Sequence, residues 1–153
     1  MKTLLSLVLA STLAVTASAV AAAPQAHSNV SVSHAWIRVL PGALPGGGYA
    51  TVHNHGEQAV QLVGADSPAY GHIMLHKSTT EGGVSRMAAV KAITVPAHGQ
   101  VAFAPGGYHL MMMQAKTPVK PGQSVPVTLH FASGATLKVP FKARPANAID
   151  DTH

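Results

Sequence analysis

The chain has 153 residues, a formal net charge of +5 and no cysteine. Its length suits one domain, and the lack of cysteine excludes disulfides, thiol nucleophiles, Cys-ligated zinc and a His₂Cys blue-copper site. Lysine and arginine occur singly, so the sequence has no basic patch and predicts no nucleic-acid partner. Hydrophobic residues make up 47% and charged residues 10%, with 14 glycines and 11 prolines scattered along the chain. This composition favours an all-β domain of short strands.

The first 23 residues are typical of an export signal. Lys2 precedes an apolar run and then a series of small residues, which suits cleavage between residues 19 and 23. A membrane anchor is the alternative, but the apolar run is short and interrupted by serine and threonine. The sequence therefore predicts a cleaved signal peptide over 1–23, a flexible lead-in over 24–29, and a periplasmic protein without stable membrane insertion.

Nine short β-type segments follow, separated by turn-forming glycine, proline and asparagine residues. They cover residues 30–39, 49–54, 60–65, 72–78, 84–90, 100–104, 109–114, 125–131 and 136–141. The stretch 41–48 is rich in glycine and proline and is predicted to be a loop. Because no long segment shows a capped helical period, the pattern predicts a β-sandwich or partly closed barrel over 30–144. The polar tail over 145–153 is expected to be loose.

Histidine and methionine are unusually frequent for a chain with one tryptophan. There are ten histidines and six methionines, and apart from Met1 every methionine lies between Met74 and Met113. A thioether is a preferred ligand of soft Cu(I), and imidazole also binds copper. Methionine withstands an oxidising compartment better than a free thiol, which would form disulfides. This inventory indicates a copper site built from histidine and methionine.

Alternation along two of the predicted strands places these side chains on particular faces. Because residues two apart in a strand share a face, two sets of side chains are expected to point outward together. These sets are His72, Met74 and His76 in one strand, and His109, Met111 and Met113 in the other. Leu110 and Met112 point to the opposite face, where we expect them to fill the core.

A hairpin centred on Glu81-Gly82 is predicted to set His76 opposite Met87. Directly opposed residues have Cβ atoms about 4.5–5.5 Å apart, which is close enough for both to ligate one ion. His109 and Met111 supply a second pair from a single strand. A sandwich that brings the two pairs together makes a four-ligand copper site.

The spacing of these four residues, His76-x10-Met87-x21-His109-x-Met111, matches the signature of the PCuAC family of periplasmic copper chaperones. Further segments resemble that family, from about Val30 to Phe141: His34-Ala35-Trp36-Ile37-Arg38, Gly48-Tyr49-Ala50, Met74-Leu75-His76, Gly82-Gly83-Val84-Ser85-Arg86-Met87 and Pro105-Gly106-Gly107-Tyr108-His109-Leu110-Met111. The resemblance implies a cupredoxin-like sandwich that binds Cu(I), one ion per chain. It also implies delivery of copper towards the Cu(A) centre of cytochrome c oxidase, with oxidase subunit II or an assembly factor as partner. We expect a monomer.

Several neighbouring residues are expected to have lesser roles. Met74 shares the face of His76 and is predicted to wall the site rather than ligate the ion. His53 and His55 share a face beside a turn and offer a weaker second site. Trp36 and Tyr108 are expected to pack at the border of the site. The tail offers a single histidine, so the His/Met-rich tail of some PCuAC members is missing.

Two alternatives from other classes remain open. A secreted copper or zinc enzyme needs an open coordination position and a general acid or base. The carboxylates are Glu57, Asp66, Glu81, Asp150 and Asp151. Only Glu81 lies within the His/Met motif, so we expect no catalysis. A metal-free secreted module for adhesion or assembly would explain the fold and the signal, but it would leave the ligand spacing to coincidence.

Overall fold

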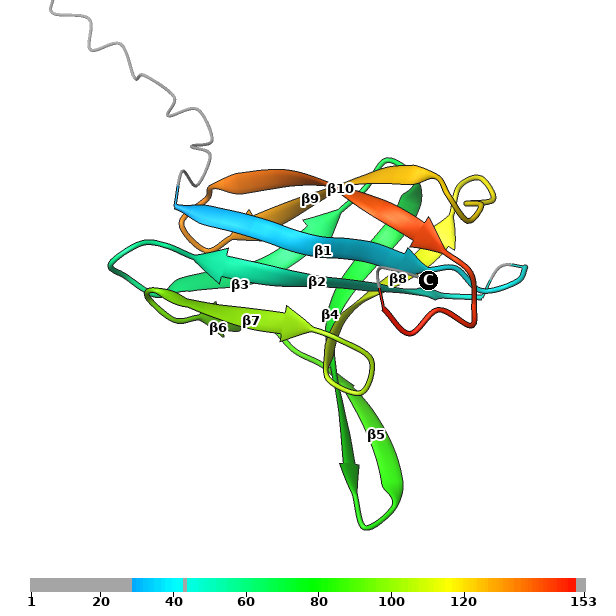
Figure 1. Cartoon of the computed structure of the whole chain (residues 1–153), viewed down its shortest axis with the longest axis horizontal. Coiled ribbons are helices and arrows are strands. Elements are labelled where there is room, and N and C mark those ends of the chain that lie inside the picture. The colour runs from blue at the N-terminus through cyan, green and yellow to red at the C-terminus, as the bar shows by residue number, and fades with distance from the viewer. Residues whose placement is uncertain (1–28, 43, 151–153) are drawn as a thin grey trace, which may run out of the picture.

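The computed structural model describes residues 29–42 and 44–150. The predicted signal peptide and nearly all of the predicted lead-in lie outside these residues. Ten strands and no helix occur within the described part (Figure 1), which therefore holds no helix capable of crossing a membrane. The strands are β1 (Val30–Arg38), β2 (Gly46–Asn54), β3 (Val60–Asp66), β4 (Tyr70–Glu81), β5 (Val84–Ala89), β6 (Ile93–Val95), β7 (Gly99–Phe103), β8 (Tyr108–Ala115), β9 (Ser124–Phe131) and β10 (Thr136–Arg144). The predicted all-β class is confirmed.

The ten strands form one mixed sheet in the order β5-β4-β8-β7-β2-β1-β10-β9-β3-β6. β1 pairs in parallel with β10, and β7 with β8, while the other pairings are antiparallel. The sheet is open, with β5 and β6 at its edges, and it folds over so that β3 packs against β4 (Figure 1). This arrangement resembles the cupredoxin-like fold that the sequence predicts.

The core lies between the two halves of the folded sheet and follows the alternation of the strands. In β9, every second residue from Val125 to Phe131 is buried. In β8, Leu110 and Met112 are almost completely buried, as predicted. Burying a side chain of this kind contributes about 1.5–3 kcal/mol. The inward position of Leu110 and Met112 therefore holds the alternate residues of β8 on the outer face.

Strand β2 begins at Gly46, inside the stretch predicted to be a loop. Residues Gly46–Gly48 pair with Leu110–Met112 of β8. A Cβ on Gly48 would lie 3.0 Å from the Cβ of Leu110 and 3.2 Å from the Sδ of Met112. These glycines permit the close approach of two strands rather than a turn, so the loop prediction was wrong for this segment.

The sequence also missed one strand. β6 spans only Ile93–Val95 and pairs with β3 at the edge of the sheet. Three residues are too short for a recognisable period of two. The structure consequently has ten strands where about nine were predicted.

The start of the C-terminal tail lies against the body of the domain. Ala148 is buried and packs with Trp36 and Tyr49, and the Nε of Arg38 donates a hydrogen bond to the carbonyl of Ala148 at 2.9 Å. The expectation of a loose tail therefore does not hold for this part of it. Residues 151–153 lie outside the described part of the chain.

Candidate metal centre

The outer face of β4 and β8 carries the candidate ligands. The two strands are antiparallel neighbours, and their register sets histidines and methionines opposite one another. The pairs are His76 with His109, Met74 with Met111, and His72 with Met113. Directly paired residues share a face of the sheet, so all six side chains lie together, as the alternation predicts. The intervening residues of both strands fill the core.

His109 is held in a defined orientation. It is 5% exposed, and its Nδ1 lies 3.1 Å from the carbonyl oxygen of Gly107. Because a carbonyl can only accept, Nδ1 carries a proton, and in the neutral ring Nε2 is then the nitrogen with the lone pair. Such a second hydrogen bond to a backbone carbonyl is typical of metal-ligating histidines, since it fixes the ring and the tautomer. Nε2 of His109 is thus prepared to bind a cation.

His76 lies beside this ring. The ring centroids of His76 and His109 are 5.6 Å apart and the ring planes meet at 65°. Both ring nitrogens of His76 are shielded from solvent and have no hydrogen-bond partner among the described residues. Burial and the neighbouring His109 lower the pKa of His76, so the ring is neutral at neutral pH. A buried polar atom without a partner costs about 1–3 kcal/mol, and binding a cation through one of these nitrogens would offset part of that cost.

The position of Met87 corrects the predicted hairpin. The turn is formed by Gly82 and Gly83, both at positive φ (56° and 78°), as a two-residue type I′ turn requires. Met87 therefore faces Ser78, and Ala89 faces His76. The prediction that Met87 lies directly opposite His76 was wrong by two residues. Because the shift is even, Met87 stays on the face of His76, at the diagonal position.

The hairpin of β4 and β5 projects from the body of the molecule (Figure 1). Met87 lies on it and is 54% exposed, whereas Met111 is half-buried on β8. A diagonal neighbour across two strands has its Cα about 7–8 Å away, within reach of a long side chain. Of the four predicted ligands, His76, His109 and Met111 lie together on the body of the sheet, and Met87 approaches from the projecting hairpin.

Tyr49 is a neighbour of the centre to which the sequence assigned no role. Its ring lies 6.4 Å from that of His109 and 4.6 Å from that of Trp36, centroid to centroid. The guanidinium of Arg38 lies 5.4 Å from the Tyr49 ring. Burial raises the pKa of Tyr49, against an opposing effect of Arg38. Trp36 packs against Tyr49, which in turn lies beside His109.

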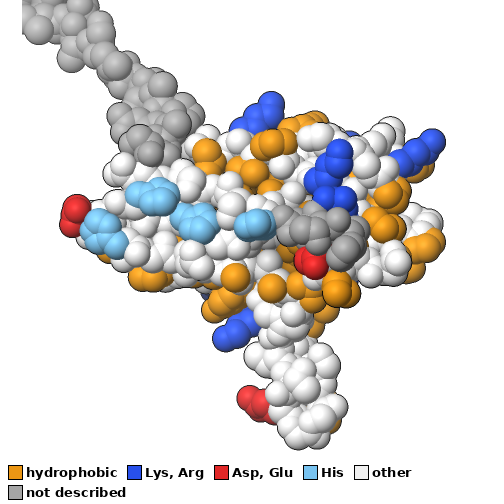
Figure 2. Space-filling model, in the orientation of Figure 1, with side chains coloured by type: hydrophobic (Ala, Val, Ile, Leu, Met, Phe, Trp, Pro, Cys, Tyr) orange, Lys and Arg blue, Asp and Glu red, His pale blue; other side chains and the backbone are white. Residues whose placement is uncertain are grey.

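At the predicted weaker site, both His53 and His55 have serine hydroxyls as hydrogen-bond partners. Their rings stack 6.2 Å apart, and Nε2 of each lies 2.8 Å from a serine hydroxyl, Ser33 and Ser31 respectively. Figure 2 shows several histidine side chains in a row on the side of the molecule that it draws. No group of three or more histidine and carboxylate side chains that could hold a metal occurs within residues 29–42 and 44–150.

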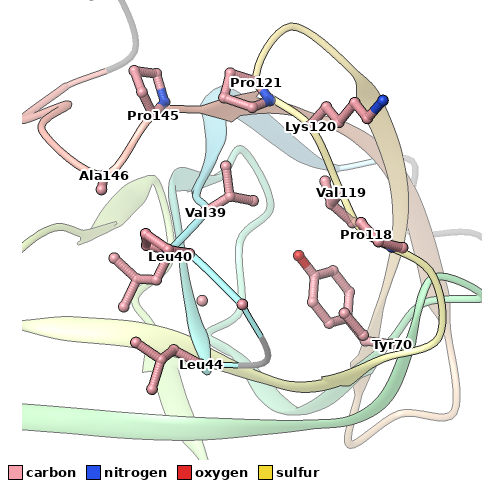
Figure 3. A pocket seen from close by; sticks show the side chains of 14 residues that line it. Val39, Leu40, Leu44, Tyr70, Pro118, Val119, Lys120, Pro121, Pro145 and Ala146 are labelled. Carbon is pink, nitrogen blue, oxygen red and sulfur yellow. The ribbon is translucent and has the colours of Figure 1, made fainter.

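An apolar hollow of about 340 Å³ lies elsewhere on the molecule (Figure 3). Tyr70 and Val119 point into it, together with several prolines. Its lining contains no histidine and no methionine. The hollow is therefore separate from the His/Met face.

Known proteins resemble this chain over most of the domain. A family model described as "Putative lipoprotein LpqE-like" matches residues 30–143. The chain belongs to the LpqE-like family. This LpqE-like protein is 35% identical over 116 residues to "Putative lipoprotein Lxx21020" of Leifsonia xyli subsp. xyli (strain CTCB07), with 74% of this chain and 69% of the relative covered.

Solved structures similar to the LpqE-like protein include PCuAC domains. The solution structure of Cu(I)-bound DR1885 from Deinococcus radiodurans is 33% identical, with 82% of this chain and 83% of that chain covered and a TM-score of 0.63. The copper-bound PCuAC domain of PmoF2 is 21% identical, covers 79% of this chain and 97% of its own, and has a TM-score of 0.66. The second likeness is one of fold alone. The predicted resemblance to the PCuAC family is confirmed.

Proposed function

We propose that this LpqE-like protein binds one Cu(I) ion at the site of His76, Met87, His109 and Met111 and carries it without catalysis. The observation that supports this most strongly is the pair of shielded, unpartnered nitrogens of His76 beside the oriented ring of His109. A bound ion would give one ring nitrogen of His76 a partner and would use the lone pair of His109.

The donor set suits Cu(I) better than other ions. Two neutral imidazoles and two thioethers carry no charge, and thioethers select soft cations such as Cu(I) over Zn(II) or hard cations. Met binds without losing a proton, and the two histidines bind in their neutral form. The related structure of DR1885 is described as its Cu(I) form, which agrees with this choice of ion.

Release requires that a ligand can be exchanged. Met87 is the most exposed of the four and lies on the projecting hairpin, so an incoming ligand of an acceptor protein would replace it first. We propose that the acceptor is oxidase subunit II or an assembly factor, and that the copper is destined for the Cu(A) centre of cytochrome c oxidase. This destination rests on the resemblance to the PCuAC family.

We further propose that the protein works outside the cytoplasm, in the periplasm. The signal-like first segment and the lipoprotein descriptions of the family and its relative support this location. The 153 residues include no cysteine, so a lipid carried on a cysteine thioether has no acceptor among them. Cell fractionation tests the proposal: the protein is expected in the periplasmic fraction, and its recovery with cytoplasmic markers would contradict it.

Titration of the reduced protein with Cu(I) and with Zn(II) separates the candidate functions. A carrier is expected to bind Cu(I) tightly in competition with a chelator and to bind Zn(II) feebly. A preference for Zn(II) would favour the enzyme alternative. Binding of neither ion would favour a metal-free assembly module. Substituting His76→Ala is expected to weaken Cu(I) binding by at least about tenfold, or 1.4 kcal/mol.

A further inference from the structure

The face of β4 and β8 holds more soft ligands than one copper site uses. Three cross-strand pairs follow one another along it, and the proposed site takes the first pair and one methionine of the second. The side chains left over are His72, Met74 and Met113. They lie on the same face, next to the proposed site and further from the hairpin.

The register makes these three residues neighbours. His72 and Met113 are direct partners, so their Cβ atoms are about 4.5–5.5 Å apart. Met74 follows His72 on the same face and lies diagonal to Met113, about 7–8 Å away. A methionine side chain is long and flexible, so the sulfur of Met74 can join the other two on one ion.

Packing does not account for this placement. Four of the five methionines in the described part of the chain lie on this outer face, and only Met112 lies in the core. Met74 and Met113 remain half-exposed, and His72 is exposed. Apolar side chains chosen for burial would be expected on the inner face, where Ile73 and Met112 already lie.

We infer that His72, Met74 and Met113 form a second, weaker Cu(I) site adjoining the first. This inference rests on the proposed function. One imidazole and two thioethers suit Cu(I) in the same way as the first site, but the second site has one ligand fewer and an exposed histidine. Met74 and Met111 face each other directly, between the His76–His109 pair and the His72–Met113 pair, so Met111 can serve the first site while Met74 serves the second. An ion can pass from one site to the other by exchanging one ligand at a time.

Nuclear magnetic resonance of the methionine methyl groups tests the inference. The protein, labelled with ¹³C at the methionine methyls and kept reduced, is titrated with Cu(I) in a chelator buffer. The methyls of Met87 and Met111 are expected to shift with the first equivalent of Cu(I), and those of Met74 and Met113 with a second. Met112, in the core, is the internal control and is expected to shift little.

A matched variant tests whether Met113 binds the second equivalent of Cu(I). Met113→Leu keeps the volume of the side chain and is expected to weaken only the second equivalent, by at least about tenfold. Saturation at one equivalent, with the methyls of Met74 and Met113 unmoved or shifting together with Met111, would overturn the second site and leave the first intact. No methyl shift at any Cu(I) concentration would overturn both sites together. Thermal melts of the apo-proteins verify that the variant is folded.

Discussion

His76 and His109 are direct cross-strand partners, yet only His109 has a ring nitrogen held by the backbone. The carbonyl of Gly107 sets the orientation of His109, while the ring of His76 has no hydrogen bond to any residue that the structure describes. One ligand is therefore oriented in advance and the other can adjust when an ion arrives. A pair of this kind combines defined geometry with the adaptability that release of the ion requires.

Exchanging methionine for leucine on β8 separates ligation from packing. Met111→Leu is expected to leave the fold intact and to lower Cu(I) affinity by at least about tenfold, because leucine has no sulfur. Met112→Leu is the matched control: its side chain lies in the core, so affinity should stay unchanged, at a stability cost below about 1.5 kcal/mol. Competition titrations and thermal melts measure both. A loss of affinity in Met112→Leu alone would mean that the copper ligands lie on the other face.

The register of the hairpin predicts that a second substitution can restore the Cu(I) affinity lost when Met87 is replaced. Met87→Leu is expected to weaken Cu(I) binding by about tenfold. Because Ala89 is the direct partner of His76, adding Ala89→Met to that variant places a thioether opposite His76 and should recover most of the affinity. Both residues are exposed, so neither change is expected to disturb the fold. Failure of the double variant to bind better than Met87→Leu would count against ligation from β5.

The lowered pKa of His76 predicts that the stability of the folded apo-protein depends on pH. Its pKa is lowered from 6.5 in the folded protein by burial and by His109. As pH falls below about 6.5, the unfolded chain binds a proton that folded His76 does not, so the free energy of unfolding decreases. The apo-protein is therefore expected to melt at a lower temperature at about pH 5.5 than at about pH 7.5. The decrease should be smaller in His76→Leu, and an equal decrease would exclude His76 as its source.

Copper binding should follow pH in the same direction. A histidine must be neutral to ligate, and a thioether does not titrate in this range. Cu(I) affinity is therefore expected to fall as the solution is acidified, with the contribution of His76 retained to a lower pH than that of an ordinary histidine. Chelator competition at several pH values measures the dependence. An affinity that is flat between about pH 7.5 and pH 5 would show that binding is by methionine alone.

The close approach of β2 and β8 predicts a stability effect at Gly48. The Cβ of Gly48→Ala would lie 3.0 Å from the Cβ of Leu110, so the strands must separate, at a cost of about 1–3 kcal/mol. Gly64→Ala is the control, since an added Cβ there meets nothing within 4 Å. Chemical denaturation is expected to show a lower midpoint for Gly48→Ala only. Equal midpoints would mean that β8 tolerates the added methyl group.

The facing of the ligands could be predicted from the sequence because alternation is a local property. His109 and Met111 share a face in any strand that contains them, and the same holds for Met74 and His76. The register across the hairpin could not be predicted as securely. Three residues, Glu81-Gly82-Gly83, offer two possible turns, and the positive φ of both glycines selects the later one.

Other features depend on contacts between distant segments. The glycines at the start of β2 have the composition of a loop, and only the proximity of Leu110 explains them as a strand. Tyr49 reaches His109 from β2, and Ala148 reaches Trp36 from beyond β10. A local sequence pattern cannot predict which distant segments will be neighbours. The surroundings of the centre therefore could not be predicted from the sequence.

The parallel pairing of β1 with β10 joins the first strand to the last, with Trp36 beside Lys142. A chain is synthesised from its N-terminus. β1 can therefore pair with β2 early, but it cannot pair with β10 until almost the whole domain has been synthesised. Contacts so distant in sequence form late and slow the folding of β proteins. During that interval the free edge of β1 can pair with another chain. The domain therefore completes its fold in a final step, and a product truncated before β10 would expose an aggregation-prone edge.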